Sequence, residues 1–158
     1  MLYAKADQRV LGYLGRALSL ELTAVQQYST QARLVAAWGL TEAAKKLGNE
    51  ASEEMGHADR IIGRMLALGV APNASQLRPV ALGQNLYELL VKNHAFENEL
   101  IRLYMEAVRH CAAKADHDNR VFFEALLGEE QAHAQELSEW IEQLRNPDSN
   151  INARGFTL

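Results

Sequence analysis

Two short segments of this sequence carry residue types that bind metal ions, at a matching spacing. Glu54 precedes His57 by three residues, and Glu130 precedes His133 by the same interval. On a helix such residues lie about one turn apart on one face, so each pair can hold a cation between a carboxylate and an imidazole. One such match carries little information in a chain of this composition, whereas two of them predict a shared site.

An internal repeat adds two further glutamates to these pairs. Glu21 precedes Glu54 by the same interval as Glu97 precedes Glu130. The constant offset between Glu21 and Glu97 also relates other matching positions, namely Tyr28 to Tyr104, Arg33 to Arg109 and His57-Ala58 to His133-Ala134. A repeat of this kind predicts two equivalent structural units, and its matches concentrate on polar positions.

We therefore expect six side chains to converge between the two repeats: Glu21, Glu54, His57, Glu97, Glu130 and His133. Four ionised carboxylates would be neutralised by two divalent cations, whereas burying them without cations is strongly unfavourable. Mixed carboxylate and imidazole ligation suits iron or manganese better than calcium or zinc. A glutamate on each of two helices with Glu-x-x-His on two others is the general pattern of dinuclear carboxylate bundles. The pattern predicts a site for two metal ions per chain, with iron as the first choice.

Four long helices are expected to position these ligands. They are predicted at residues 7–38, 41–69, 84–113 and 117–145. In the first two segments, apolar residues recur at steps of three and four, which is typical of helices that bury one face. Thr41 and Asp116 are the expected caps of the second and fourth helices, and Gly39 and Asn146-Pro147 mark helix ends.

The connections between these helices indicate how they are arranged. The first and third links are only a few residues long, so each joins an antiparallel pair. Residues 70–83 contain two of the three prolines and show no helical period, which predicts a long crossover. The expected fold is all-α, a four-helix bundle of the ferritin-like type at residues 1–145, followed by a polar tail at 146–158.

Composition limits the other classes of function. With 158 residues, of which 48% are hydrophobic, the chain is expected to form one domain with a full core. The net charge of −4 and the lack of a basic run argue against nucleic-acid binding. Cys111 is the single cysteine, which excludes an intrachain disulfide. No signal-peptide pattern or run of about 18 apolar residues is found, so a cytoplasmic protein is expected.

Several motifs make this chain similar to the bacterioferritins over roughly residues 8–145. They are LELTAVQQY around Glu21, Trp38-Gly39-Leu40, EEMGHADR around Glu54 and EEQAH ending at His133. The resemblance implies that the six predicted ligands form a ferroxidase site with Glu54 and Glu130 in the bridging positions. Such a site oxidises Fe(II) with oxygen or peroxide, and the ferric product is stored inside a hollow cage of 24 subunits.

Met55 matches the methionine that ligates haem iron in this family, one from each chain across a twofold interface. It follows Glu54 directly and is therefore rotated by about 100° away from the metal face of the helix. The resemblance implies haem b at a subunit interface, while an ordinary apolar interface contact remains the alternative.

The sequence makes less specific predictions for several other residues. Tyr28 lies two turns after Glu21, as Tyr104 does after Glu97, and either tyrosine can hydrogen-bond a ligand, donate an electron or pack in the core. Glu50 is an outer carboxylate or a solvated surface charge, and Asn93, where the family often has an acidic residue, is a candidate to orient a ligand histidine. Cys111 is expected in the core and Trp38 in packing. The remaining histidines are expected at the surface or at an interface: His94, His110 and His117.

The C-terminus departs from the family, whose members carry a short fifth helix near the cage symmetry axes. Pro147 follows the fourth helix closely, which makes a full fifth helix doubtful and puts the 24-subunit cage in question, so the expected assembly is a homo-oligomer of at least two chains. The leading hypothesis is a bacterioferritin-like ferroxidase, which implies an electron-transfer partner. The alternatives are a di-metal oxidase or peroxidase that stores no iron and a haem-binding interaction module.

Overall fold

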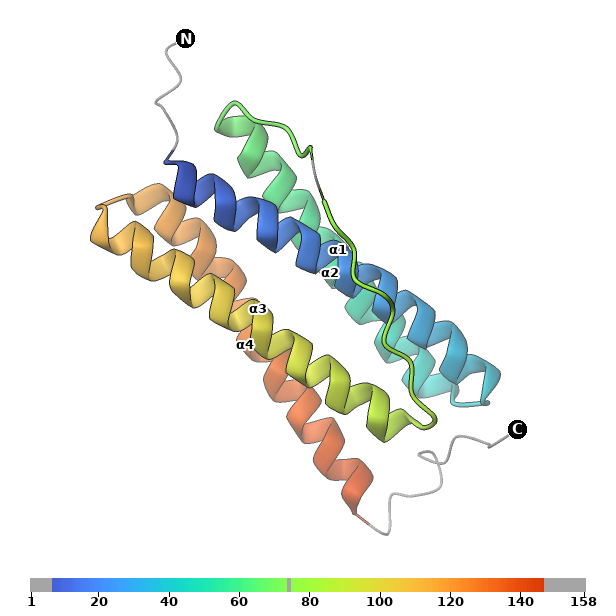
Figure 1. Cartoon of the computed structure of the whole chain (residues 1–158). Helices are drawn as coiled ribbons and strands as arrows, with labels where there is room; N and C mark the ends of the chain where they lie inside the picture. Colours follow the sequence, from blue (N-terminus) through green and yellow to red (C-terminus); the bar gives the residue numbers. More distant parts are fainter. Residues whose placement is uncertain (1–6, 74, 147–158) are drawn as a thin grey trace.

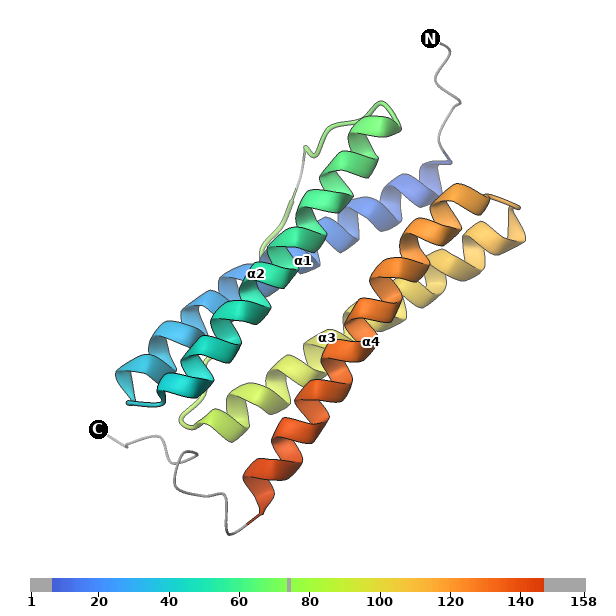
Figure 2. The same ribbon diagram turned by 180° about the vertical axis from the view of Figure 1, so that it is seen from behind.

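The computed structural model describes residues 7–73 and 75–146, and all the regular structure in these ranges is helical. The four helices are α1 (Gln8–Ala37), α2 (Thr41–Ala67), α3 (Leu86–Ala113) and α4 (His117–Arg145). They lie side by side as two antiparallel hairpins, α1 with α2 and α3 with α4 (Figures 1 and 2). The crossover from α2 to α3 runs the length of the bundle (Figure 1), which confirms the predicted ferritin-like four-helix fold.

Local signals in the sequence explain where most helices begin and end. The Asp7 side chain accepts the N–H of Arg9 at the start of α1, and Asp116 accepts that of Asn119 at the start of α4. Gly39 follows α1 with a φ of 83°, a backbone conformation that glycine adopts without strain. The cap predicted at Asp116 is therefore confirmed.

One predicted helix cap is wrong, and one helix begins slightly later than expected. Leu40 occupies the cap position of α2 without a side-chain hydrogen bond, and Thr41 is the first helical residue. Leu40 is held there by its own burial and by the hydrogen bond from its N–H to the carbonyl of Val35. The third helix begins at Leu86, two residues after the expected start, because the Asn85 side chain accepts the N–H of Glu88 and ends the crossover.

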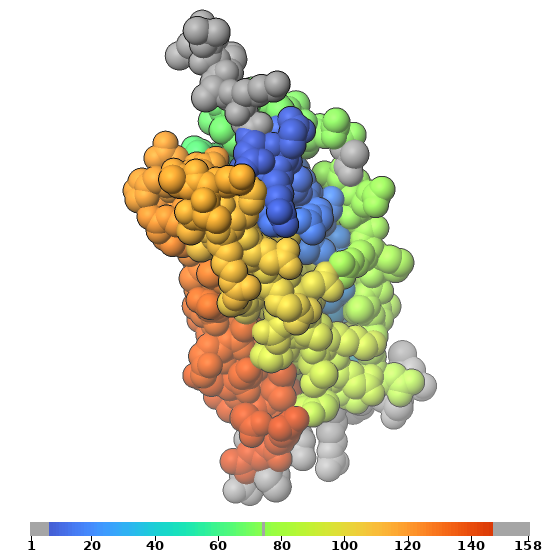
Figure 3. All heavy atoms as spheres, turned by 60° about the vertical axis from the view of Figure 1, so that its left-hand side comes forward, coloured from blue at the N-terminus to red at the C-terminus, as the bar shows by residue number. Residues whose placement is uncertain are grey.

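A polar stripe on α1 holds the crossover in place. Backbone N–H groups of Gln76, Arg78 and Ala81 donate to side chains that recur every fourth residue of α1, namely Ser19, Thr23 and Gln27. The next residue in this series, Gln31, donates to the carbonyl of Ala81. The crossover therefore lies against α1 on the surface of the bundle (Figure 3), where its backbone groups are satisfied without secondary structure.

Two apolar clusters form most of the core. The larger one lies around Leu14, Ile61 and Phe123, near the beginning of α1, and the other lies around Leu47, Leu89 and Leu137. Both contain residues from all four helices. The middle of the bundle contains buried polar side chains instead, and this is where the predicted ligands lie.

The predictions for the tail and for a fifth helix concern residues 147–158, which lie outside the described ranges. Within the part of the chain that the structure describes, no helix is long and apolar enough to cross a bilayer.

Candidate metal centre

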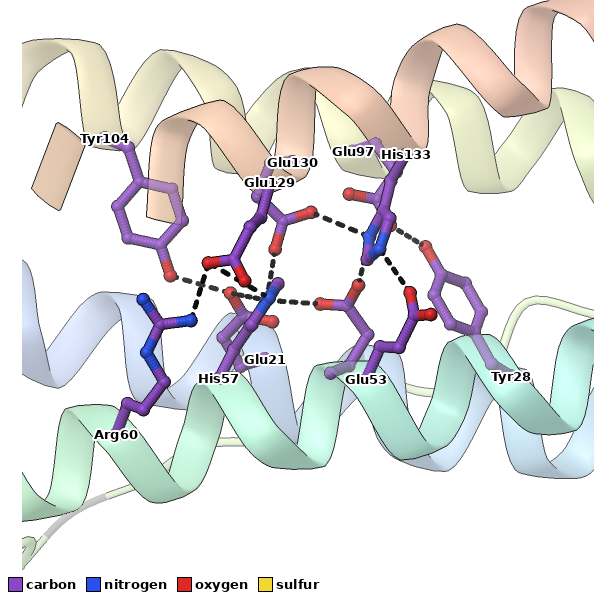
Figure 4. A network of polar contacts seen from close by, with 11 residues as sticks. Glu21, Tyr28, Glu53, His57, Arg60, Glu97, Tyr104, Glu129, Glu130 and His133 are labelled. Atoms are coloured by element: carbon purple, nitrogen blue, oxygen red, sulfur yellow. Dashed lines mark hydrogen bonds and ion pairs between the residues drawn. The ribbon is translucent and has the colours of Figure 1, made fainter. Parts of the chain in front are cut away.

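The structure brings all six predicted ligands together at the centre of the bundle. Each helix contributes from its middle, where the backbone N–H and C=O groups are paired within the helix (Figure 4). Five of the six residues are 0 to 4% exposed, and the His133 side chain is 11% exposed. The six residues are Glu21 from α1, Glu54 and His57 from α2, Glu97 from α3, and Glu130 and His133 from α4.

Their ligand atoms form two overlapping groups. One contains Glu21 and His57, the other contains Glu97 and His133, and Glu54 and Glu130 belong to both. Within each group the four ligand atoms lie no more than 4.8 Å from one another. This arrangement can hold two cations side by side, with two carboxylates shared between them.

The histidines point the same ring nitrogen into the cluster. His57 Nδ1 lies 2.8 Å from Glu130 Oε1 and 3.4 Å from oxygens of Glu21 and Glu54. His133 Nδ1 lies 2.8 Å from Glu54 Oε1, in an ion-pair contact that lacks hydrogen-bond geometry. The two rings stack with their centroids 5.7 Å apart. Each imidazole thus reaches the carboxylates of both repeats.

The carboxylates are underused as hydrogen-bond acceptors. Both oxygens of Glu54 and one oxygen each of Glu21, Glu97 and Glu130 are sealed from solvent without a hydrogen-bond partner among the described residues. Buried polar atoms of this kind are costly unless something else compensates them. Carboxylate oxygens with imidazole nitrogens are the donors that iron and manganese prefer, so the residues present fit a dinuclear metal centre.

Protonation balances part of this charge in the metal-free chain. Burial, followed by the neighbouring carboxyl group of Glu21, raises the pKa of Glu54 to about 8. Burial and the neighbouring Glu130 hold the pKa of Glu97 well above its usual range. Burial alone would lower the pKa of His57 and of His133, but their contacts with the carboxylates, Glu130 first, raise it to about 12 in each case. Protons therefore occupy the place of cations, and a metal must displace them.

Two tyrosines connect the repeats crosswise. The Tyr28 hydroxyl donates to Glu97 Oε1 at 2.5 Å, and the Tyr104 hydroxyl donates to Glu21 Oε1 at 2.7 Å (Figure 4). Both tyrosines are fully buried, and burial together with the adjacent carboxylate raises the pKa of each phenol well above its usual value. Each tyrosine keeps its proton and holds the unshared glutamate of the other repeat, Glu97 or Glu21. The structure therefore shows two of the roles left open by the sequence, a hydrogen bond to a ligand and packing in the core.

The remaining predicted residues fall into different environments. Met55 is 43% exposed, in agreement with its rotation away from the metal face. Glu50 is mostly buried rather than a solvated surface charge, and one of its oxygens lacks a hydrogen-bond partner among the described residues. Cys111 is buried as expected, and Trp38 packs against the apolar cluster around Leu47.

One expectation outside the centre is wrong. Asn93 orients no histidine, because its amide group bonds Gln27 and Gln31 and thereby joins α3 to the stripe that holds the crossover. His110 is only 10% exposed, since its Nε2 pairs with Asp7 Oδ2 at 2.6 Å at the contact between α1 and α3. His94 is half-buried and bonds Ser138, whereas His117 is exposed.

The sequence interpretation missed three charged residues around the histidines. Glu53 contacts His133 Nε2, Glu129 Oε2 lies 3.9 Å from His57 Nε2, and Arg60 is paired with Glu129. The internal repeat was a signal for two of them, because Glu53 and Glu129 match at the same offset as the ligands.

Comparison with known proteins agrees with the fold. The family model of the ferritin-like domain matches residues 11–146. A bacterioferritin of Rhodobacter capsulatus is 41% identical over 98% of this chain and 93% of its own length. A bacterioferritin of Brucella melitensis biotype 1 is 36% identical over 82% of this chain and 80% of its own length.

A solved structure extends this similarity to the backbone. The structure of Rhodobacter capsulatus bacterioferritin, described with a metal-free dinuclear site and a haem iron in a crystallographic special position, has a TM-score of 0.88 and 37% identity. The match covers 98% of this chain and 99% of that one. A four-helix bundle with a carboxylate and histidine centre defines the class of ferritin-like proteins. Within that class, this chain belongs to the bacterioferritin family.

Proposed function

We propose that this protein is a ferroxidase that oxidises Fe(II) to Fe(III) at its central site and serves iron storage and detoxification. The observation that carries the proposal is the pair of overlapping ligand groups, which share Glu54 and Glu130. Shared carboxylates place two metal ions close enough to deliver two electrons to one oxidant. The solved bacterioferritin of Rhodobacter capsulatus, whose dinuclear site is described as metal-free, supports the same reading.

The chemistry balances with oxygen or with peroxide. Two Fe(II) ions supply two electrons, which reduce one O₂ with two protons to hydrogen peroxide, or one hydrogen peroxide with two protons to two water molecules. The chain supplies the four carboxylate charges that offset two divalent cations, and the two Nδ1 atoms that complete their ligand sets. The imidazole protons leave when the metal enters, because the same nitrogen cannot bind both.

Tyr28 has a positioning role in this proposal. Its hydroxyl restrains Glu97, as that of Tyr104 restrains Glu21, so these two ligands keep their orientation before iron arrives. Electron donation by Tyr28 stays a prediction, and a tyrosyl radical signal that appears during oxidation and is lost in Tyr28→Phe is its test.

Iron titration tests the ferroxidase proposal directly. Adding Fe(II) to metal-free protein under oxygen should give a fast absorbance phase that saturates at two irons per chain. Glu54→Ala combined with Glu130→Ala should abolish this phase, while the matched control Glu42→Ala with Glu106→Ala, two exposed glutamates, should retain it. A fast phase that survives loss of Glu54 and Glu130 would contradict the proposal.

Storage and assembly need a separate measurement. A cage that stores iron elutes as a large oligomer and takes up many irons per chain. A small oligomer that holds only about two metals per chain would favour the di-metal oxidase or peroxidase without storage. Native mass and iron content after repeated loading distinguish these outcomes, and the same sizing shows whether the chain forms dimers.

Haem binding at Met55 is a second candidate function. Met55 is exposed on α2, and its place directly after Glu54 turns it away from the metal face of the helix, so this residue would be available to hold a haem iron at an interface between two chains. Bound haem would supply a one-electron redox group. Haem added to the protein should give an absorption spectrum with methionine ligation that is lost in Met55→Leu, and an unchanged spectrum in that variant would contradict this assignment.

A further inference from the structure

The two histidines connect the buried centre to the surface. While Nδ1 of each ring faces the carboxylates, the outer edges of both rings line a depression of about 430 Å³ between α2 and α4. The other lining residues include Glu53 and Glu136 together with Arg60 and Glu129. Any difference between the two ends of this depression therefore acts on one metal position more than on the other.

The outer carboxylates are equivalent in sequence but not in their contacts. Glu53 and Glu129 match in the repeat, and each is the outer neighbour of one histidine. Glu53 contacts His133 Nε2 directly, whereas Glu129 Oε2 stays 3.9 Å from His57 Nε2 (Figure 4).

An arginine explains this difference. Arg60 Nη1 lies 2.5 Å from Glu129 Oε2, so the guanidinium holds Glu129 and neutralises its charge. The position that matches Arg60 in the other repeat is Glu136, which is exposed. One end of the depression thus carries an ion pair, and the other carries two acidic side chains, Glu53 and Glu136, with the Glu53 carboxylate on a histidine.

This asymmetry affects metal binding through the imidazole. A histidine that binds metal through Nδ1 keeps its proton on Nε2, and a carboxylate that accepts this proton orients the ring and makes it a stronger ligand. Glu53 is placed to do so for His133, whereas Arg60 withholds Glu129 from His57. The acidic side chains at the His133 end, where no arginine among the described residues lines the depression, also attract cations to that end. Partners of this kind are typically worth about 10- to 100-fold in metal affinity.

We propose that the two metal positions fill in a fixed order, His133 first and His57 second, and that Arg60 and its repeat partner Glu136 set this order. The inference rests on the proposed function, because it assumes the dinuclear site. The order gives each chain a tightly held first ion and a more loosely held second ion. Arg60 and Glu136 act through the histidines and are positioning residues.

Cobalt(II) binding to the metal-free full chain measures this order. Titration followed by the visible absorption of Co(II) should show two steps whose dissociation constants differ by about 10- to 100-fold. His133→Ala should lose the tighter step, while His57→Ala should keep it. Two steps of equal affinity, or loss of the tighter step in His57→Ala, would overturn the proposal.

Exchanging the charges of Arg60 and Glu136 tests whether these two residues set the order in which the metal positions fill. Arg60→Glu should tighten the second step by about tenfold and leave the first in place, because Glu129 is released to His57. Glu136→Arg should weaken the first step, because the new arginine draws Glu53 away from His133. The matched control Lys45→Glu changes the charge of an exposed α2 residue by the same amount and should alter neither step.

The outcomes separate this inference from the proposed function. If both exchanges move the two steps equally, or leave both unchanged, the positional argument is wrong although the dinuclear site stands. If the wild-type chain binds fewer than two Co(II) ions, the proposed function itself fails.

Discussion

The buried carboxyl group of Glu50, close to the metal centre, should lower the folding stability of the metal-free protein by a measurable amount. It lies one turn before Glu54 on α2, and its Oε2 atom is sealed from solvent without a hydrogen-bond partner among the described residues. Burial raises the pKa of Glu50 to about 8, with a further contribution from Glu97 and against the opposite effect of His133. Glu50→Gln removes the ionisable group and keeps its shape, so this variant should stabilise the metal-free protein.

The size and pH dependence of this gain follow from the shifted pKa. The unfolded carboxyl ionises near pH 4.5 and the folded one near 8, so the folded state binds more protons between these values. The wild-type contribution to stability is therefore complete below pH 4.5 and falls as the pH rises towards 8. At about 1.4 kcal/mol per pKa unit, Glu50→Gln should gain about 3 kcal/mol at pH 7, and up to about 5 at pH 9.

Urea unfolding of metal-free wild type and variant at pH 4, 7 and 9 tests this prediction. A gain of about 3 kcal/mol corresponds to a rise of roughly 6–12 °C in Tm for a chain of this length. The exposed Glu106→Gln serves as the matched control and should change stability little at any pH. Equal stability of wild type and Glu50→Gln at pH 9 would refute the reasoning that burial keeps this carboxyl protonated.

Three further predictions concern the centre and the core. Zinc binding to metal-free protein at pH 7 should release at least two protons per chain, because contacts with Glu130 keep the pKa of His57 and of His133 near 12 despite burial. Calorimetry in two buffers measures this release, and a result without proton release would contradict the prediction. Burial raises the pKa of Cys111 to about 11, so a disulfide reagent at pH 8 should label the thiol only after unfolding, and rapid labelling of native protein would argue against it. Phe123→Ala should lower the free energy of unfolding by about 3–5 kcal/mol in urea, since the ring is fully buried between Tyr13 and Tyr104, and a loss below about 1 kcal/mol would show that the site repacks.

Periodicity and repetition in the sequence were sufficient for the fold and for the membership of the central cluster. A spacing of three residues places Glu54 and His57 on one face of any helix, because helical geometry is local. The constant offset of the repeat relates Glu21 to Glu97 and adds both to the set, since a repeated hairpin brings matching positions to matching places. Helix-end signals such as Asp116 act within a few residues and are therefore readable in the sequence.

Contacts between distant helices were decided only by the tertiary structure. The role of Asn93 depends on Gln27 and Gln31, which lie on another helix far away in the sequence, so no local pattern distinguishes an amide that holds the crossover from one that orients a histidine. In the same way, the pairing of Arg60 with Glu129 joins α2 to α4 across 69 residues. The repeat specifies which side chains are equivalent, whereas packing determines which of two equivalent carboxylates reaches its histidine. The reason is that a hydrogen bond needs two groups within about 3 Å, and spacing along the sequence does not measure that distance.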